Sequence, residues 1–354
     1  MLTDGMSTPT APLPSTMRAA VYVKKRRVQV EERPLPEIGP DDVLLRVSHC
    51  GVCGTDLHLV MEGWGRPNSI GGHEYSGEVA AVGPSIRDWQ IGEGAVGGPE
   101  PGCGRCAYCA AGRPGLCAEH ANPGLGDFQG AFAEYKSVRA DQLLRTPEGL
   151  SLRNAAITEP LAVSLHGITA SGIRAGQRAL VTGAGPIGLF TLAALRARGI
   201  DDVTVSEPSP VRREQAARVG AARVITPEAL ESPRMPFEIV VDPVDAAFEC
   251  SGNPEAVQSA LAQLDKTGVL VLVGTGMQKP RLDANRVLLN ELTITGAYNY
   301  DDNGVADALE LLASERLPTD LLIEPGDVGL DGLLEAMERL ERGRIGGKVL
   351  VNPN

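Results

Sequence analysis

The sequence predicts a two-domain α/β protein, in which a mostly β domain is joined to a doubly wound parallel sheet. The chain has 354 residues, which is longer than a single hydrophobic core usually supports. Short β-rich runs separated by Gly and Pro fill its first part. From about residue 162, apolar strands alternate with Ala-rich helices, which is typical of parallel βαβ units. This change in the sequence pattern marks the expected boundary between the two domains.

The mostly β domain is predicted to span residues 17–161. Residues 1–16 lack the basic start and apolar segment of a secretion signal and are expected to be a disordered tail. Order begins with the strand-like run RAAVYV, followed by VLLRV, EVAAVG and AFAEYKSV. Residues 297–354 contain two helical segments and the closing strand GKVLVNP, and we expect them to fold back onto this domain.

Residues 162–296 are predicted to form the doubly wound domain. Its first half reads as RALVTGAG, PIGLFTLAALRARG, DVTVSEP and REQAARVGA, and its second half as DAAFECSG, PEAVQSALAQL, GVLVLVGTG and ELTITGAY. Between these halves, the Pro-rich residues 223–246 have no clear place in the pattern.

Composition limits the class of protein. Hydrophobic residues make up 43% of the chain and charged residues 22%, and no apolar run approaches the length of a membrane span. The formal charge of −12 argues against a nucleic-acid partner. Seven cysteines are too few for a disulfide scaffold, and their close spacing suggests metal in a reducing compartment. We therefore expect a cytoplasmic protein with a small-molecule substrate and no membrane partner.

Four cysteines lie in one short Gly- and Pro-rich loop as C-x2-C-x2-C-x7-C: Cys103, Cys106, Cys109 and Cys117. Four thiolates at this spacing close tetrahedrally around Zn²⁺ and leave no open position, so the loop predicts a structural zinc site. Free or disulfide-paired thiols and an iron–sulfur cluster are the alternatives, although the spacing does not match ferredoxins.

A second set of candidate ligands is dispersed along the chain. Cys53 lies in CGVCGTDLH, His73 in GGHEYSGE and Glu159 in ITEPLAV. One thiolate, one imidazole and one carboxylate, with a water or substrate oxygen as the fourth ligand, suit a catalytic zinc ion. Each residue alone is weak evidence, since an isolated Cys or His is more often a core or surface residue. Glu74 is a candidate for an alternative or water-mediated ligand. An equally good interpretation is that Glu74 is not a ligand and is either solvated or paired in the core.

Three neighbours of Cys53 complete the predicted catalytic site. Asp56 is placed to accept the free ring N–H of His73, with a turn-forming Asp as the alternative. Thr55 and His58 are the candidate proton relay, because the proton of a metal-bound alcohol must leave a dry pocket through a hydroxyl and an imidazole. A plain surface histidine is the alternative for His58.

The run RALVTGAGPIGLF predicts a dinucleotide-binding loop. Gly183, Gly185 and Gly188 form G-x-G-x-x-G between a predicted strand and a predicted helix, and Pro186 and Ile187 occupy the positions before the last glycine. In this context the glycines allow a tight turn, close approach of the backbone to a pyrophosphate, and close helix packing.

The acidic residue that follows the next strand predicts the coenzyme. Glu207 lies at the end of DVTVSE, where a carboxylate accepts the ribose hydroxyls of NAD and repels the 2′-phosphate of NADP. Arg212 and Arg213 follow and offer a phosphate contact, although a solvated helix face is the favoured interpretation of them. The sequence thus favours NAD.

Four of these motifs, CGVCGTDLH, GGHEYSG, the four-cysteine loop and GAGPIG, resemble the zinc-containing medium-chain dehydrogenase/reductase family from about Met17 to the C-terminus. The resemblance implies a GroES-like first domain, a Rossmann second domain, and a homodimer or homotetramer. It also implies that Cys53, His73 and Glu159 hold a catalytic zinc, with Thr55 and His58 in the relay. EPLAVSLHG with Glu159 is similar to the polyol and butanediol branch.

The sequence thus predicts an NAD-linked alcohol dehydrogenase with two zinc ions per subunit, acting on a secondary alcohol, diol or polyol. Two alternatives remain at this point. One is a zinc-independent quinone- or enoyl-type reductase of the same superfamily, and the other is a non-catalytic NAD-binding protein.

Overall fold

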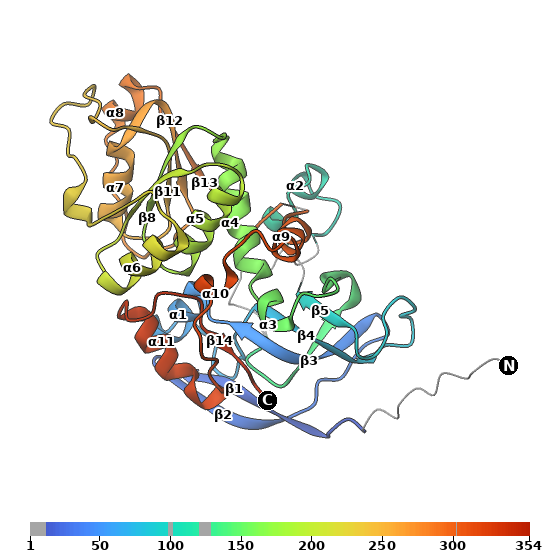
Figure 1. Cartoon of the computed structure of the whole chain (residues 1–354). Coiled ribbons are helices and arrows are strands. Elements are labelled where there is room, and N and C mark those ends of the chain that lie inside the picture. The colour runs from blue at the N-terminus through green and yellow to red at the C-terminus, as the bar shows by residue number, and fades with distance from the viewer. Residues whose placement is uncertain (1–11, 98–101, 120–128, 302) are drawn as a thin grey trace.

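The computed structural model describes residues 12–97, 102–119, 129–301 and 303–354 (Figure 1). Residues 1–11, most of the segment expected to be a disordered tail, lie outside this part of the chain. Within the described residues, the strands form a two-stranded hairpin and two six-stranded sheets. Among the helices of the same residues, none is long and apolar enough to cross a membrane.

The first sheet is antiparallel, with the strand order β14-β3-β4-β5-β7 and with β6 also paired to β3. The strands of the hairpin and of this sheet are β1 (Thr16–Lys24), β2 (Arg27–Pro34), β3 (Asp42–Gly51), β4 (Glu74–Val82), β5 (Gly94–Gly97), β6 (Tyr135–Arg139), β7 (Leu143–Arg145) and β14 (Leu350–Val351). Val43, Leu45 and Val47 of β3 are buried in one core, as expected of alternate residues on one face of a strand.

The second sheet is parallel, with the order β10-β9-β8-β11-β12-β13. Its strands are β8 (Arg178–Thr182), β9 (Asp202–Ser206), β10 (Arg223–Ile225), β11 (Val244–Glu249), β12 (Leu264–Leu272) and β13 (Thr293–Gly296). The strand order reverses between β8 and β11, and open parallel sheets bind ligands beyond the carboxyl ends of the strands at such a point. The predicted nucleotide loop follows β8 directly.

The longest helix, α4, lies between the two sheets and contacts β4 of the first and β12 of the second (Figure 1). The helices of the described residues are α1 (Gly54–Leu57), α2 (Ala107–Ala110), α3 (Leu152–Ala155), α4 (Thr158–Ser171), α5 (Pro186–Ala197), α6 (Pro210–Val219), α7 (Pro254–Ala262), α8 (Ala284–Leu289), α9 (Gly304–Ala313), α10 (Thr319–Leu322) and α11 (Leu333–Glu341). Gly172 ends α4 with a left-handed φ of 67°, a conformation that glycine adopts without steric cost.

The Pro-rich segment that had no clear place in the sequence pattern contains β10, one 3₁₀ turn at Pro227–Ala229, and irregular chain up to β11. Polar side chains of α8 and its C-cap fix it. Asn290 donates from Nδ2 to the carbonyl oxygen of Pro236 at 2.8 Å, and the buried Arg286 lies beside the same carbonyl. The segment is thus held by hydrogen bonds to its backbone rather than by regular structure of its own.

The C-terminal segment returns to the first sheet. Leu333, Met337 and Leu340 of α11 belong to the same core as β3, and β14 pairs with the end of β3, with Leu350 opposite Gly51. This return places Lys348, two residues before β14, beside Glu74 at the start of β4.

Candidate active site

Three of the dispersed candidate ligands come together where β3, α1 and β4 meet. Cys53 immediately precedes α1, His73 immediately precedes β4, and Glu74 is the first residue of β4. One ligand atom from each lies within 4.8 Å of the other two. A thiolate, an imidazole and a carboxylate at this separation can share one metal ion.

Glu159, the third predicted ligand, lies in the first turn of α4 and is not part of this 4.8 Å group, but its charge acts on His73. Burial raises the pKa of Glu159 to about 7, and the Glu74 carboxylate adds to this effect. Burial lowers the pKa of His73, but the Cys53 thiolate, Asp56 and Glu159 together raise it well above its usual value. The site is therefore a half-buried cluster with an excess of negative charge around one imidazole. A bound cation would relieve that excess, so the donor set fits a divalent metal.

Asp56 is a buried side chain that contacts the backbone beside two of the candidate ligands. Its buried carboxylate accepts the backbone N–H of Cys53 at 2.9 Å and that of Gly72 at 3.2 Å. These hydrogen bonds fix the backbone beside Cys53 and His73, and the negative charge of Asp56 also raises the pKa of His73. The predicted hydrogen bond from the His73 ring stays a prediction.

Lys348, a residue that no sequence motif singles out, is paired with Glu74. Its Nζ lies 2.7 and 2.6 Å from the two carboxylate oxygens and 3.1 Å from the carbonyl oxygen of Val52. Both side chains are buried, with 1% of the lysine and none of the glutamate exposed. The signal for this residue was a lone Lys in an apolar C-terminal strand run, GKVLV, but its partner lies 274 positions away.

The candidate relay residues lie on one helical turn. The Oγ1 of Thr55 is 3.7 Å from the Sγ of Cys53, and His58 lies three residues further on, where α1 continues into a π-helical turn, η1 (His58–Glu62). Residues three apart on a helix share a face. The ring of His58 stacks on Trp64, with centroids 5.1 Å apart. His58 is therefore held in place rather than being a freely solvated surface histidine.

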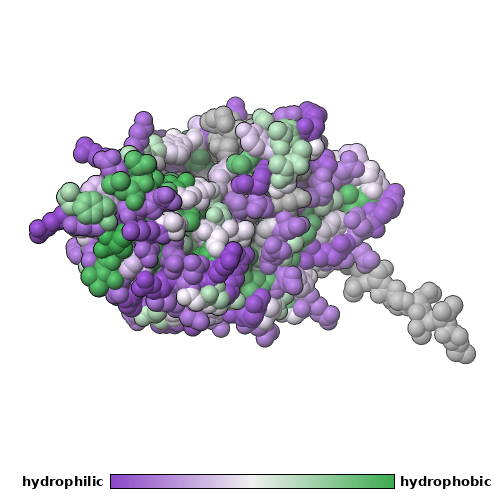
Figure 2. All heavy atoms as spheres, turned by 90° about the horizontal axis from the view of Figure 1, so that it is seen from above, coloured by the Kyte–Doolittle hydropathy of each residue, from purple (hydrophilic) through white to green (hydrophobic). Residues whose placement is uncertain are grey.

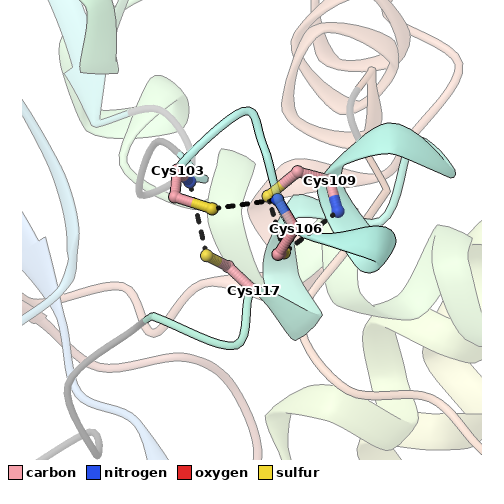
Figure 3. A group of neighbouring side chains, drawn as sticks. All are labelled: Cys103, Cys106, Cys109 and Cys117. Atoms are coloured by element: carbon pink, nitrogen blue, oxygen red, sulfur yellow. Dashed lines mark hydrogen bonds between the residues drawn. The ribbon is translucent and has the colours of Figure 1, made fainter.

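The four cysteines of the loop converge on one point (Figure 3). The backbone N–H of Cys106 donates to the Sγ of Cys103 at 3.3 Å, and that of Cys103 donates to the Sγ of Cys117 at 3.3 Å. Backbone N–H donors from Ala118 and Cys109 lower the pKa of Cys106 to about 6. Such donors stabilise thiolates, which are the metal-binding form of cysteine. The geometry thus suits a closed four-sulfur site.

The four-cysteine lobe, residues 102–119, is attached to the interdomain region. The Nε of Arg113 lies 2.7 Å from Oδ1 of Asp301, and the Nδ1 of His166 on α4 lies 3.1 Å from the other oxygen of the same carboxylate. A Cβ on Gly115 would lie 3.2 Å from the carbonyl oxygen of Tyr300, so the lobe packs closely there. Hence the lobe contacts α4, the helix that carries Glu159 in its first turn.

The nucleotide loop has the geometry that its glycines predict. Gly183 has a left-handed φ of 89°, and a Cβ on Gly188 would lie 1.9 Å from the carbonyl oxygen of Gly183. Gly185 has open space around it, with only the Nη1 of Arg212 within 4 Å of its Cβ position. Pro186 and Ile187 form the start of α5. The loop can therefore approach a phosphate closely at the N-terminus of α5.

Glu207 and Arg212 lie against this loop. The Glu207 carboxylate is buried and accepts the backbone N–H groups of Ala184 and Ser209 at 2.7 and 2.8 Å. Arg212 donates from Nε and Nη2 to the carbonyl oxygens of Ile345 and Leu340. The interpretation of Arg212 as part of a solvated helix face is wrong, because the C-terminal segment packs over it and half-buries it.

Comparisons with known proteins agree with this arrangement. Residues 39–148 match the alcohol dehydrogenase GroES-like domain, and residues 186–314 match the zinc-binding dehydrogenase domain. The chain is 34% identical to the sorbitol dehydrogenase of Bacillus subtilis over 97% of this chain and 99% of that protein. It is 30% identical to the (R,R)-butanediol dehydrogenase of the same organism, over 96% of this chain and 100% of that protein.

Among solved structures, a Sinorhizobium meliloti protein bound to NADP superposes with a TM-score of 0.85 at 32% identity, covering 96% of this chain and 100% of the other. Together with the observed sheets, these matches confirm the predicted GroES-like and Rossmann fold classes. The predicted resemblance to sorbitol and butanediol dehydrogenases is confirmed as well.

Proposed function

The chain belongs to the zinc-type medium-chain dehydrogenase family, and from that premise we propose that it is a zinc-dependent, NAD-linked dehydrogenase of secondary alcohols, diols or polyols. It is an oxidoreductase that acts on CH–OH donors. The observation that carries the proposal is the cluster of the half-buried Cys53 and His73 with the buried Glu74, with Glu159 on α4 close enough to act on the pKa of His73.

The catalytic zinc would be held by Cys53, His73 and Glu159, because Glu74 is already engaged by Lys348. Zinc bound there would lower the pKa of the substrate hydroxyl, and NAD along the glycine loop would accept the hydride. The balanced reaction converts an alcohol and NAD⁺ into a ketone, NADH and one proton.

The proton leaves through this chain's own residues. Thr55 lies beside the Cys53 sulfur and would accept the hydroxyl proton from the substrate. His58, on the same helical turn, would pass it outward, because an imidazole can accept a proton on one ring nitrogen and release one from the other. Stacking on Trp64 limits the ring to a narrow range of orientations, which suits a positioned proton carrier.

We propose NAD as the coenzyme. Glu207 places a carboxylate at the end of β9 beside the glycine loop, where it would accept ribose hydroxyls and repel a 2′-phosphate. Arg212 has two of its nitrogens committed to backbone carbonyls, which supports a role in holding the C-terminal segment against the loop rather than in binding a 2′-phosphate.

We propose a second, structural zinc in the lobe, bound by Cys103, Cys106, Cys109 and Cys117. The lobe is short and rich in Gly and Pro, and four convergent sulfurs would give it a centre that apolar packing does not supply. Elemental analysis of the purified protein should give about two zinc ions per chain.

We propose a cytoplasmic homodimer or homotetramer. Within the described residues, β13 ends the parallel sheet with an open edge. Figure 2 shows apolar residues on the surface at the end of the molecule that this sheet forms, where Leu288 and Leu289 of α8 are 71% and 55% exposed. Light scattering tests the oligomeric state, and cell fractionation tests the location.

A substrate screen tests the activity. The zinc-loaded protein is incubated with NAD and a panel of vicinal diols, sugar alcohols, and cyclic and linear secondary alcohols, and NADH absorbance is followed. The proposal expects turnover with secondary alcohols and diols, and the reverse reaction with the matching ketones. Turnover restricted to quinones or activated alkenes, with NADH or NADPH as the reductant, would contradict it.

A further inference from the structure

Lys348 is a fully buried cation beside the candidate metal site. It comes from the C-terminal segment, which pairs with β3 through β14. Its ammonium group has three N–H donors, and three acceptors surround it: the two oxygens of Glu74 and the carbonyl oxygen of Val52. A buried charge with all its donors satisfied is held in one position.

The Glu74 carboxylate is equally confined. A Cβ on Gly51 would lie 2.1 Å from its Oε2, so the carboxylate occupies space that only a glycine on β3 leaves open. Both oxygens face Lys348 at 2.6 and 2.7 Å. Yet one Glu74 oxygen also lies within 4.8 Å of ligand atoms of Cys53 and His73. Without Lys348, a small rotation of this side chain would therefore bring a carboxylate to the metal.

Lys348 offsets part of the negative charge of the site. The Cys53 thiolate and three carboxylates carry four negative charges when ionised, against two from a divalent cation and one from the ammonium group; the carboxylates are Asp56, Glu74 and Glu159. Uncompensated charge in a buried site is costly. If Glu74 lost its ammonium partner, the carboxylate would be expected to move to the metal, which is the nearest other positive charge.

We propose that Lys348 is a positioning residue of the metal site. It keeps Glu74 out of the metal's ligand shell, so that Glu159 supplies the carboxylate ligand and one position remains open for the substrate oxygen. This inference rests on the proposed catalytic zinc. The inference adds that Glu74 and Glu159 are alternative carboxylate ligands for one position on the metal. Lys348, from the C-terminal segment, determines which of them binds.

Metal content under ligand replacement tests the proposal without relying on turnover. Glu159→Gln should lower bound zinc from about two ions per chain to about one, because Glu74 is withheld by Lys348. Adding Lys348→Met should restore about two, because Glu74 then replaces the lost ligand. Adding Glu74→Gln as well should return the count to about one. The lobe zinc is expected in every variant, so its presence shows that the protein is folded. Lys266 is an exposed lysine of β12, and Lys266→Met is the matched control for the loss of one lysine charge.

Cobalt spectra supply a second readout. With Co²⁺ in place of zinc, Lys348→Met alone should change the visible absorption toward that of a higher coordination number, and alcohol turnover should fall about tenfold or more. The double variant Glu74→Gln/Lys348→Met carries no unpaired buried charge. It should give the wild-type spectrum, even if the single variant fails to fold.

Two results would overturn the inference. One is full zinc content in Glu159→Gln with Lys348 intact, since Glu74 would then already be a ligand. The other is a double variant whose cobalt spectrum differs from that of the wild type. A wild-type protein that binds only the lobe zinc and turns over no alcohol would instead overturn the proposed function itself, so the two failures are distinct.

Discussion

The hydroxyl oxygen of Thr275 lies 3.4 Å from the Nε2 of His58. Thr275 belongs to the loop after β12 of the parallel sheet, whereas His58 lies beside the candidate metal site on the other domain. The other ring nitrogen of His58 is 3.0 Å from a carboxylate oxygen of Glu62, although not aligned for a hydrogen bond. The orientation of the proposed proton carrier is therefore set from both domains.

Replacing Thr275 with Val should slow alcohol oxidation by up to about tenfold, because one hydrogen bond that orients the imidazole is lost while the shape is kept. Thr275→Ser, which retains the hydroxyl, should restore most of kcat. Steady-state kinetics measure both variants, with Thr293→Val, an exposed threonine on β13, as the control. Wild-type kcat in Thr275→Val would contradict this role.

Zinc affinity at the catalytic site should depend on pH. The pKa of Glu159 is raised to about 7, and that of His73 also lies above its usual value. Both groups must lose their protons to bind metal, so protons compete with zinc increasingly as pH falls through the raised values. Affinity should fall by about tenfold or more per pH unit below about pH 7. Chelator competition on the metal-free protein measures this, and an affinity unchanged between about pH 6 and pH 8 would be inconsistent with it.

Charge removal at Glu207 should weaken discrimination against NADP. Glu207→Gln keeps one acceptor oxygen, for one of the two backbone N–H groups of Ala184 and Ser209 that the carboxylate now accepts, and it no longer repels a phosphate. The ratio of kcat/KM for NAD over NADP should drop by about one to two orders of magnitude, since juxtaposed like charges cost several kcal/mol. An unchanged ratio would mean that other residues select the coenzyme.

Loss of one lobe ligand should affect stability more than chemistry. Cys109→Ser should remove about one zinc ion per chain and lower the thermal midpoint, because a closed four-ligand site contributes its binding energy to folding. Turnover per remaining catalytic zinc should persist at temperatures where the protein is folded. Calorimetry with elemental analysis checks this, and unchanged zinc content would rule out the lobe site.

Local patterns were the part of this protein that the sequence could predict. The spacing of Cys103 to Cys117 and of Gly183 to Gly188 defines local geometry within a few residues. The lobe and the nucleotide loop can therefore be predicted from the sequence alone. Strand and helix alternation likewise predicted the parallel sheet. The β1–β2 hairpin was not separated, because RVQVEERP is mostly polar and only half-buried.

Contacts between distant segments were beyond sequence reasoning. Nothing near Lys348 indicates that its partner is Glu74, and nothing near Thr275 indicates that it meets His58. Arg212 was expected on a solvated face because its neighbours are polar, yet the return of the C-terminal segment covers it. In each case, tertiary contacts between segments that are distant in the sequence set the environment of the side chain, rather than local composition.

The central claim is that a zinc ion held by His73 and its neighbours carries the oxidation of an alcohol by NAD. The most direct measurement compares zinc content and NADH formation in the wild type and in His73→Ala, with NAD binding measured on both. We predict that His73→Ala loses about one zinc ion per chain and essentially all turnover while still binding NAD. Full turnover in His73→Ala with lowered zinc content would contradict the claim.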